Sequence, residues 1–512
     1  MYLDEQFSMY QLAHHLVTKH QFEVLYINNK EEEIWLEQNV KRNSNVIRLI
    51  HKGFDWKNHL RNDIAITFQR CKALSKVITG KFITIHNVYF SSHPPVDDWE
   101  FLKKPMQLKE KNATKMNVYY ITNENTQEEK SRLLSSLEMD STLEGKSSEE
   151  KETAVLIYKK ALEDALFAKK KEVDNLFFYG KPFLTYLLLA INIILFIWLE
   201  VRGGSEDIHN LIASGAKYNP AIIEGEWWRI ISSMFLHIGV LHLMMNMLAV
   251  YYLGSTVERI YGSARFLFIY FLAGIGGGLA SFAFSYNISA GASGALFGLF
   301  GALLFFGVIY KKVFFQTMGR GVLIILAINI VFGFLVPQVD YSAHLGGLAA
   351  GFIASAIIHF PHKKKIALQL SALVIYFLLL SGLVAFGIQH NETSQEYYLM
   401  QIDELLQREK YQEVVEVATE GLAKEGELEA NLLFQRSYAY IQLDRSEEAE
   451  KDLEQTIEID NSLSEAHYNL AVLYANKGDL TKAREAIERA SQLKPKDENI
   501  KSLYDQLMEQ SP

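Results

Sequence analysis

Cysteine is nearly absent from the sequence, since Cys71 is the only one in 512 residues. A single thiol excludes an intramolecular disulfide and a metal site built from several cysteines. An excess of positive charge is also lacking: the formal net charge is −9, and no basic stripe of the kind that follows a phosphate backbone occurs. These two absences argue against a disulfide-stabilised fold and against nucleic-acid binding.

A secretory signal peptide is also missing, because the first residues, M-Y-L-D-E-Q-F-S-M-Y, are polar rather than charged and then apolar. Hydrophobic residues are instead concentrated between 183 and 388, so we expect the first membrane segment to be retained. The change in composition predicts three domains. They are a soluble domain with its linker at 1–178, a membrane domain at 179–390 and a second soluble domain at 391–512.

Seven stretches are apolar enough to cross a bilayer, which takes about 20 residues in a helix. They are 183–201, 240–257, 266–286, 291–309, 320–336, 342–360 and 366–388. The second stretch contains His and Asn and the fifth is short, so these two are the least certain to be membrane spans by hydrophobicity alone. A long amphipathic loop at 202–239 separates the first two spans.

Lysine and arginine are distributed unevenly between the two ends of these spans. The loops at one end contain Lys169, Lys170, Lys171, Lys181, Arg259, Arg265, Lys311, Lys312, Arg320, Lys363, Lys364 and Lys365. The loops at the other end contain only Arg202, Lys217 and Arg229. Because short loops rich in Lys and Arg stay in the cytoplasm, we expect a plasma-membrane protein with a cytoplasmic N-terminus and, after seven spans, an extracytoplasmic C-terminus.

Four of the polar side chains within the predicted spans share a position near the outer surface. They are His242 and Asn246 in the second span, Ser293 in the fourth and His344 in the sixth. Taken singly, a serine beside glycine favours helix packing, and His or Asn in a span favours a structural hydrogen bond. Their common depth favours a functional cluster, since polar groups inside a membrane are costly.

Small residues follow one face of the same spans. They are Gly347 and Gly351 after His344, and Gly294, Gly298 and Gly301 after Ser293. Faces of this kind let two helices approach closely. We therefore expect Ser293 Oγ to come within hydrogen-bond reach of His344, and Phe297 to stack on the imidazole.

A serine beside a base is the minimum for covalent acyl transfer. His344 would accept the Ser293 proton during attack and return it to the leaving amine. No acid is well placed as a third member, since Asp340 precedes His344 by four residues in the loop, so a dyad is favoured over a triad. His242 and Asn246, with the backbone N–H of Ser293, are suitable donors to an oxyanion.

The G-x-S-x-G pattern of soluble hydrolases is not met, because Ala295 stands two residues after Ser293. The motifs instead resemble those of the rhomboid intramembrane serine proteases. These motifs are W-R at 228–229, H-L-M-M-N from His242, G-A-S-G at 291–294 and H-x-x-G-x-x-x-G from His344. They occur in the family's order across about 180–390.

The resemblance implies a bundle of six core helices plus one, a catalytic dyad of Ser293 and His344, and an oxyanion site of His242 and Asn246. The residues expected to shape the site are Gly291, Gly294, Phe297, Gly347, Gly351, Trp228 and Arg229. Glu258 and Gly262 fit a further family pattern after the second span. It also implies transmembrane substrates that unwind readily and carry a small residue before the cut, and no required cofactor. Soluble domains at both ends resemble the long rhomboids of Gram-positive bacilli.

A 34-residue period in the C-terminal domain predicts tetratricopeptide repeats, which are stacked pairs of helices. Equivalent positions are Tyr440 and Tyr474, Ala449 and Ala483, and Leu453 and Ile487. A weaker first repeat falls near 396–428 and a capping helix at 498–509. The alternative is a helical hairpin bundle of another kind. Because repeat surfaces bind peptides or proteins, we expect this domain to recruit substrates or adaptors.

The N-terminal domain alternates apolar strands at 22–27, 46–50, 81–90 and 116–121 with helices near 4–19, 56–79 and 147–176. This alternation predicts an α/β or α+β fold with an acidic, lysine-rich linker around 124–152. A regulatory divalent cation could be held by one of two histidine groups, although surface histidines without function are the simpler explanation. The groups are His14, His15 and His20, or His86 with His93.

Three functions remain open from the sequence. The first is an intramembrane serine endopeptidase. The second is a catalytically silent relative that binds membrane clients through its repeats. The third is a transporter that uses His and Asn as an ion path. An intact Ser293 and His344 favour the protease over the silent form, and the lack of Asp or Glu on the span faces that would line a transport path counts against transport.

Overall fold

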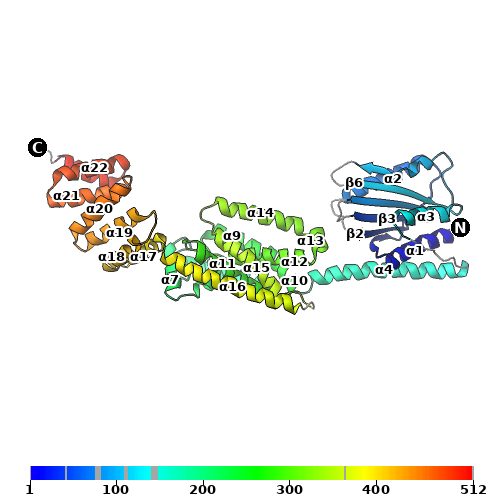
Figure 1. The fold of residues 1–512 in the computed structure, drawn as a ribbon, viewed down its shortest axis with the longest axis horizontal. Coiled ribbons are helices and arrows are strands. Elements are labelled where there is room, and N and C mark those ends of the chain that lie inside the picture. Colours follow the sequence, from blue (N-terminus) through cyan, green and yellow to red (C-terminus); the bar gives the residue numbers. More distant parts are fainter. Residues whose placement is uncertain are drawn as a thin grey trace. The chain divides into compact units, whose positions relative to one another are not determined.

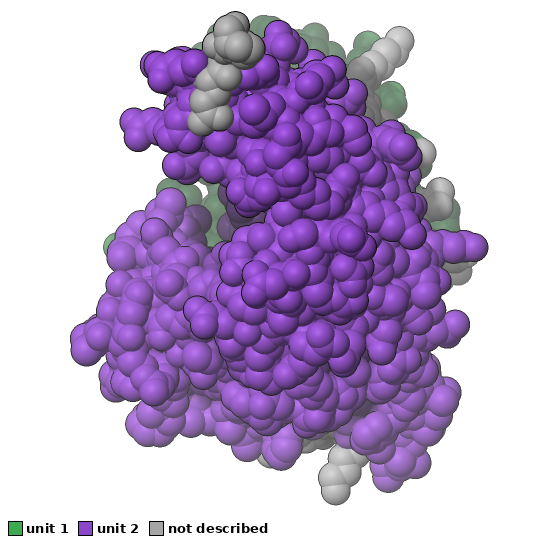
Figure 2. Space-filling view, turned by 90° about the vertical axis from the view of Figure 1, so that its left-hand side faces the viewer, with its two compact units in different colours: residues 1–178, 310–319 green, residues 179–309, 320–512 purple. Residues whose placement is uncertain are grey.

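The computed structural model describes residues 2–40, 43–74, 82–108, 113–139, 148–361 and 365–509. The chain forms two compact units, which Figure 2 colours separately. The first unit contains residues 1–178 and 310–319, and the second contains 179–309 and 320–512. Each unit has hydrophobic cores of its own.

A mixed six-stranded sheet forms the centre of the first unit (Figure 1). Its strands are β1 (Glu23–Asn28), β2 (Glu33–Val40), β3 (Asn43–His51), β4 (Phe82–Phe90), β5 (Met106–Leu108) and β6 (Ala113–Ile121), in the order β1-β2-β3-β4-β6-β5. The first three are antiparallel, whereas β3, β4 and β6 run parallel and β5 pairs antiparallel with β6. Helix α2 (Lys57–Leu74) supplies the crossover that the parallel β3–β4 step requires.

The sheet buries both of its faces, because successive side chains of a strand point to opposite sides. On β3, Ile47 and Leu49 join one core and Val46 joins the other. Helices of the first unit supply the opposing apolar faces. One side packs against α1 (Tyr2–Lys19), α3 (Thr126–Ser136) and α4 (Ser148–Phe177), and the other side packs against α2.

This architecture confirms the expected α/β fold and corrects two details. The segment expected to be a linker, 124–152, contains α3, which buries Leu133 and Leu134 in the core. Part of that segment, 140–147, lies outside the described residues. Strands β2 and β5 were not among the elements that the sequence predicts.

Seven apolar helices match the seven predicted spans within a few residues. They are α5 (Phe183–Arg202), α9 (Gly239–Ala249) continued through η3 (Val250–Gly254) into α10 (Ser255–Tyr261), α11 (Ser263–Phe284), α12 (Ser293–Ile309), α14 (Gly319–Leu335), α15 (Tyr341–Ile358) and α16 (Ile366–Glu392). Within the described part of the chain, five of these are long and apolar enough to cross a membrane. The fifth predicted span, 320–336, corresponds to α14, which follows the short helix α13 (Lys311–Thr317), and α12 is a shorter apolar helix.

The long loop between the first two spans folds into short helices. They are α6 (Ile208–Ala213), α7 (Asn219–Ile223), α8 (Arg229–Ser232) and η2 (Ser233–Phe235). Helix α7 packs against the first repeat helix: Ile223 joins the repeat core, and Tyr218 Oη donates to the Met400 carbonyl at 2.8 Å.

The repeat region consists of stacked helix pairs that follow directly from the last span (Figure 1). Its helices are α17 (Gln395–Gln407), α18 (Tyr411–Leu422), α19 (Glu429–Gln442), α20 (Ser446–Ile459), α21 (Ser464–Lys477), α22 (Leu480–Leu493) and α23 (Glu498–Glu509). Small residues at the predicted 34-residue spacing, Ala449 and Ala483, are fully buried where helices meet. The last helix matches the expected capping helix at 498–509.

Candidate active site

Helices α12 and α15 pack backbone against backbone. A side chain at Gly347 would collide with the carbonyl oxygen of Gly294, and one at Gly351 would collide with that of Gly298. Gly301 meets the Leu348 carbonyl in the same way. The close approach that the glycine pattern predicts is therefore present, and it pairs the N-terminal ends of the two helices.

This pairing brings Ser293 and His344 to the same end of the interface. Ser293 is the first residue of α12, and His344 lies in the first turn of α15. The imidazole of His344 stacks on Phe297, with ring centroids 4.1 Å apart and planes 11° apart, as expected. Its Nδ1 is buried without a hydrogen-bond partner in the described chain, and Ser293 and His344 are not hydrogen bonded to each other. Such bonds are often made only when substrate is bound.

His242 lies beside the segment that leads into Ser293. A Cβ at Gly291 would lie 2.9 Å from His242 Cε1 and 3.0 Å from His242 Nε2. Gly291 also has a φ of +151°, which L side chains rarely adopt. The ring of His242 therefore borders the backbone that leads into Ser293.

Asn246 lies one helical turn below His242 on α9. Its side chain is buried, its Nδ2 donates to the His242 carbonyl at 3.0 Å, and its Oδ1 has no partner among the described residues. Because a carboxamide nitrogen carries two N–H groups, a second donor remains for another acceptor.

Asp340 is committed to helix α15 rather than to the imidazole. It is the N-cap residue of α15: its Oδ1 accepts from the Ala343 N–H at 2.9 Å. Its Oδ2 accepts a hydrogen bond from Ser281. These contacts stabilise the helix end that carries His344.

His237 is a residue at this site that sequence reasoning missed. It lies in the loop before α9, is fully buried, and its Nε2 accepts from the Ala292 N–H at 3.4 Å. Its ring contacts His242 edge to face, with centroids 5.4 Å apart. Burial lowers the pKa of His237 to about 3, so the ring is a neutral acceptor at physiological pH. The available signal was its position five residues before His242.

Lys217 is a second residue that the sequence did not single out beyond its charge. The side chain is buried, and its Nζ donates to the carbonyls of Ser285 at 2.6 Å and Asn287 at 3.0 Å. Backbone bonds between Lys217 and Ser289 join the same two segments. Burial lowers the pKa of Lys217 to about 8. These bonds join the long first loop to the segment that precedes Ser293.

Trp228 and Arg229 hold the first loop together. Arg229 donates to the carbonyls of Ile212 and Ala216, at 2.6 and 3.1 Å, and forms an ion pair with Glu226. Its guanidinium lies 5.0 Å from the centre of the Trp228 ring, which in turn leaves no room for a side chain at Gly215.

Glu258 closes the second span at the opposite end of the bundle. It is fully buried and accepts from the backbone N–H groups of Leu184 and Thr185, at 2.9 and 2.8 Å. It also accepts from the hydroxyl of Ser263 at 2.6 Å. These bonds satisfy the free N–H groups at the start of α5, so the residue is structural.

The candidate cation residues in the first unit have different surroundings. His15 Nε2 lies 3.3 Å from His20 Nε2, whereas His14 stacks on Tyr158. His86 is buried in the sheet, and His93 pairs with Asp55. Within the described residues, no group of three or more His, Cys, Asp or Glu side chains is placed to hold a metal ion.

Comparison with known proteins agrees with this geometry. The rhomboid domain model matches residues 224–361, and a tetratricopeptide repeat model matches 441–507. The chain is 34% identical over 476 residues to "Rhomboid protease GluP" of Bacillus subtilis, covering 92% of each protein. It is 32% identical over 177 residues to "Putative rhomboid protease YdcA" of the same organism, covering 34% of this chain and 87% of that relative. With "Rhomboid protease AarA" of Providencia stuartii the identity is 28% over 271 residues, covering 47% and 94%.

These similarities identify the repeats as tetratricopeptide repeats rather than as another helical bundle. The order of the domains is also that of a long bacterial rhomboid. The similarity to GluP extends over nearly the full length of both proteins and includes the segments that pair α12 with α15. The chain therefore belongs to the rhomboid family of membrane-embedded serine proteases.

Proposed function

We propose that this protein hydrolyses peptide bonds in or near the transmembrane segments of membrane proteins through a dyad of Ser293 and His344. The observation that carries the proposal is the glycine-paired interface of α12 and α15. It holds the first residue of one helix and the first turn of the other at a common end, and Phe297 orients the imidazole.

In the proposed reaction, Ser293 Oγ attacks the carbonyl carbon of the scissile bond while His344 accepts the hydroxyl proton. The tetrahedral intermediate then collapses: the C–N bond breaks, and His344 donates the proton to the leaving amine. Water, deprotonated by the same imidazole, attacks the resulting acyl-enzyme, and the acid product and free Ser293 follow. This chemistry uses side chains alone, and proteases of this family require no cofactor.

The oxyanion is proposed to form between His242, Asn246 and the backbone N–H of Ser293. Two features support this assignment: the contact of His242 with Gly291, and the position of Ser293 at a helix N-terminus. Free N–H groups and the helix dipole there favour negative charge. Donors that are already in place stabilise the transition state without reorganisation.

We further propose that the active site opens to the extracytoplasmic side of the plasma membrane. The support is the uneven distribution of Lys and Arg, which places 1–178 in the cytoplasm and 391–512 outside. In this arrangement 179–390 is the protease domain, the N-terminal domain regulates it, and the repeats recruit substrates or adaptors.

The dyad is tested with purified protein and a model transmembrane substrate. Wild-type protein should cleave it, whereas Ser293→Ala and His344→Ala should reduce cleavage by at least a thousandfold, because each removes the nucleophile or its base. A matched control is Ser355→Ala, since this hydroxyl lies within α15 and donates only to the Gly351 carbonyl. The control should retain activity.

A serine-directed covalent probe gives an independent result. It should label Ser293 in the wild type and in Ser355→Ala, but not in Ser293→Ala. Cleavage that survives Ser293→Ala would contradict the dyad. A wild-type protein that folds but neither cleaves nor reacts with the probe would instead support the catalytically silent form.

A regulatory divalent cation is proposed at the only pair of candidate histidines that the structure brings together, His15 and His20. Two imidazoles are fewer ligands than a closed zinc site uses, so water would complete the coordination. Isothermal titration of zinc into wild-type protein and into His15→Ala tests this proposal. Equal binding by both proteins would contradict it.

A further inference from the structure

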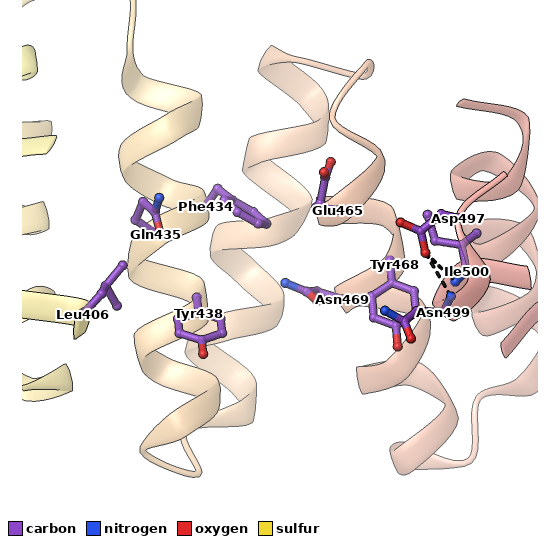
Figure 3. Close-up of a pocket in the computed structure, with 10 residues that line it drawn as sticks. All are labelled: Leu406, Phe434, Gln435, Tyr438, Glu465, Tyr468, Asn469, Asp497, Asn499 and Ile500. Atoms are coloured by element: carbon purple, nitrogen blue, oxygen red, sulfur yellow. Dashed lines mark hydrogen bonds between the residues drawn. The ribbon is translucent and has the colours of Figure 1, made fainter. Parts of the chain in front are cut away.

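One face of the repeat region contains a pocket of about 470 Å³ (Figure 3). Its walls come from the first helix of successive helix pairs, namely α17, α19 and α21, and from α23 with the turn before it. The lining residues are Leu406, Phe434, Gln435, Tyr438, Glu465, Tyr468, Asn469, Asp497, Asn499 and Ile500. We call this pocket the repeat groove.

The lining follows the sequence repeat. Phe434 and Tyr468 are 34 residues apart, and so are Gln435 and Asn469. The second and third repeats therefore each present an aromatic ring followed by a carboxamide to the groove, as Figure 3 shows for both pairs. The side-chain amides of Gln435 and Asn469 make no hydrogen bond to any other described residue, and both residues are partly exposed.

Carboxamides that have no hydrogen-bond partner and recur at the repeat spacing are able to bind an extended peptide backbone. A carboxamide both donates and accepts hydrogen bonds, and an extended backbone offers one donor and one acceptor per residue. The rings of Phe434 and Tyr468, with Tyr438, add flat apolar surface for side chains that alternate along such a segment.

The charge of the groove is negative. None of its ten lining residues is Lys or Arg, and two are acidic, Glu465 and Asp497. Glu465 forms an ion pair with Lys494, whereas Asp497 Oδ1 accepts from the backbone N–H groups of Asn499 at 3.0 Å and Ile500 at 3.1 Å. The surrounding domain is also acidic, with 26 Asp and Glu against 13 Lys and Arg between residues 395 and 512.

We propose that the repeat groove binds an extended polypeptide segment that carries Lys or Arg side chains. The carboxamides hold its backbone, the rings contact its apolar side chains, and Asp497 with the field of the acidic domain selects its positive charge. An acidic segment or a chain-terminal carboxylate would meet like charge there and lacks a basic partner among the lining residues. This binding is separate from catalysis, since no groove residue belongs to the proposed dyad.

The test uses full-length Ser293→Ala protein in a non-ionic detergent, so that no peptide is cleaved and a failure of the dyad does not affect the result. Fluorescence anisotropy is measured with three labelled synthetic peptides that alternate apolar residues with lysine, glutamine or glutamate. The lysine peptide should bind most tightly and weaken as salt is added. The glutamine peptide should bind more weakly, and the glutamate peptide should not bind.

Two groove variants locate the binding. Asp497→Asn removes the charge and keeps the helix cap, because Asn is an equally good N-cap residue, and it should weaken the lysine peptide about two- to fivefold. Asn469→Ala should weaken the lysine and glutamine peptides alike, about tenfold, since it removes a backbone partner. Thermal unfolding shows that each variant remains folded.

The matched control is Asp479→Asn. Asp479 caps α22 by accepting from the Lys482 N–H at 3.1 Å and does not line the groove. The substitution therefore removes one negative charge from a helix cap, as Asp497→Asn does, at a position outside the groove. It should leave binding unchanged. The proposal is overturned if Asp479→Asn and Asp497→Asn weaken binding equally, if the glutamate peptide binds as well as the lysine peptide, or if none of the three binds.

Discussion

At the scale of single residues, the proposed site depends on groups that have no reactive chemistry of their own. Gly291 carries no side chain, yet it determines where His242 lies, since the imidazole occupies the space that a Cβ would need. His237 bonds to the residue before the nucleophile and touches the same imidazole. The geometry around Ser293 is therefore maintained from both sides of the loop at 291–293.

Gly291→Ala should reduce cleavage strongly with a smaller effect on stability. The added Cβ displaces His242 from the proposed oxyanion site, so we expect a loss of about 100-fold, the size of one oxyanion donor. Gly225→Ala is the matched control, because Gly225 also has a positive φ, +110°, but nothing lies within 4 Å of its Cβ position. Cleavage assays and thermal unfolding separate the two effects; equal loss of activity in both variants would refute this role.

His237 predicts a dependence of stability on pH. Burial lowers its pKa from 6.5 to about 3 in the folded protein. Below pH 6.5 the unfolded chain therefore takes up a proton that the folded chain excludes. The free energy of unfolding should fall by about 1.4 kcal/mol per pH unit from this group as the pH decreases toward 3.

The matched variant for this pH dependence is His237→Gln, whose Oε1 is able to accept from the Ala292 N–H without titrating. Its unfolding midpoint, measured between pH 6.5 and 4.5, should fall less steeply than that of the wild type. The remaining histidines are common to both proteins and cancel in the comparison. Parallel curves would show that His237 is not the titrating group.

At the scale of helices, small residues promote association by allowing close packing. The hydrophobic effect does not supply this association, because both helices are already in lipid. Glycine lets α12 and α15 reach van der Waals contact along their backbones, and Gly276 and Gly346 do the same between α11 and α15. Ser293 and His344 therefore lie at one end of an interface where three helices pack through glycine. Helix α14, by contrast, exposes Ile324, Ile328 and Val331.

Gly347→Ala should lower both thermal stability and activity. The methyl group would collide with the Gly294 carbonyl and force α12 and α15 apart, which moves His344 relative to Ser293. We expect a stability loss of about 1–3 kcal/mol from overpacking and at least a tenfold slower cleavage. Gly382→Ala in α16 is the control, since its Cβ position is open, and it should be neutral or slightly stabilising. Equal behaviour of the two variants would contradict the packing argument.

The sequence predicted the membrane helices more completely than the strands and helices of the soluble N-terminal domain. The spans followed from hydrophobic length, and the glycine faces followed from helical spacing, because both signals are local. Strand β2 was missed because its sequence, E-I-W-L-E-Q-N-V, contains buried acids, and Glu33 is compensated by Arg48 from β3. An ion pair between two strands cannot be predicted from the sequence of either strand alone. Helix α3 was missed because its apolar face is narrow and its flanks are charged.

At the scale of the whole second unit, buried polar groups join the repeats to the segment 282–290, which precedes Ser293. Asn391, at the end of α16, donates to the carbonyls of Phe282 and Gly387, at 3.1 and 2.8 Å, and accepts from Asn219 at 2.7 Å. Asn219 also donates to Ser285, in the segment that Lys217 holds. The first repeat helix is therefore anchored to the loops that precede Ser293.

Asn391→Ala should loosen this junction. It leaves buried polar groups without partners, which costs about 1–3 kcal/mol, and it should increase backbone hydrogen exchange in 282–290 and in α17. Gln389→Ala, an exposed carboxamide two residues earlier, is the matched control and should leave exchange unchanged. Faster exchange confined to α16 itself would argue against a connection between the repeats and the segment 282–290.

The sequence by itself determined the order of the spans, the repeat period and the candidates Ser293, His344, His242 and Asn246, because each rests on hydrophobicity or spacing within one segment. Only the tertiary structure decided their surroundings. It placed Gly291 against His242, and the buried His237 and Lys217 on the loops around Ser293. The physical reason is that burial and hydrogen-bond partners come from residues distant in the chain, and no local pattern records them.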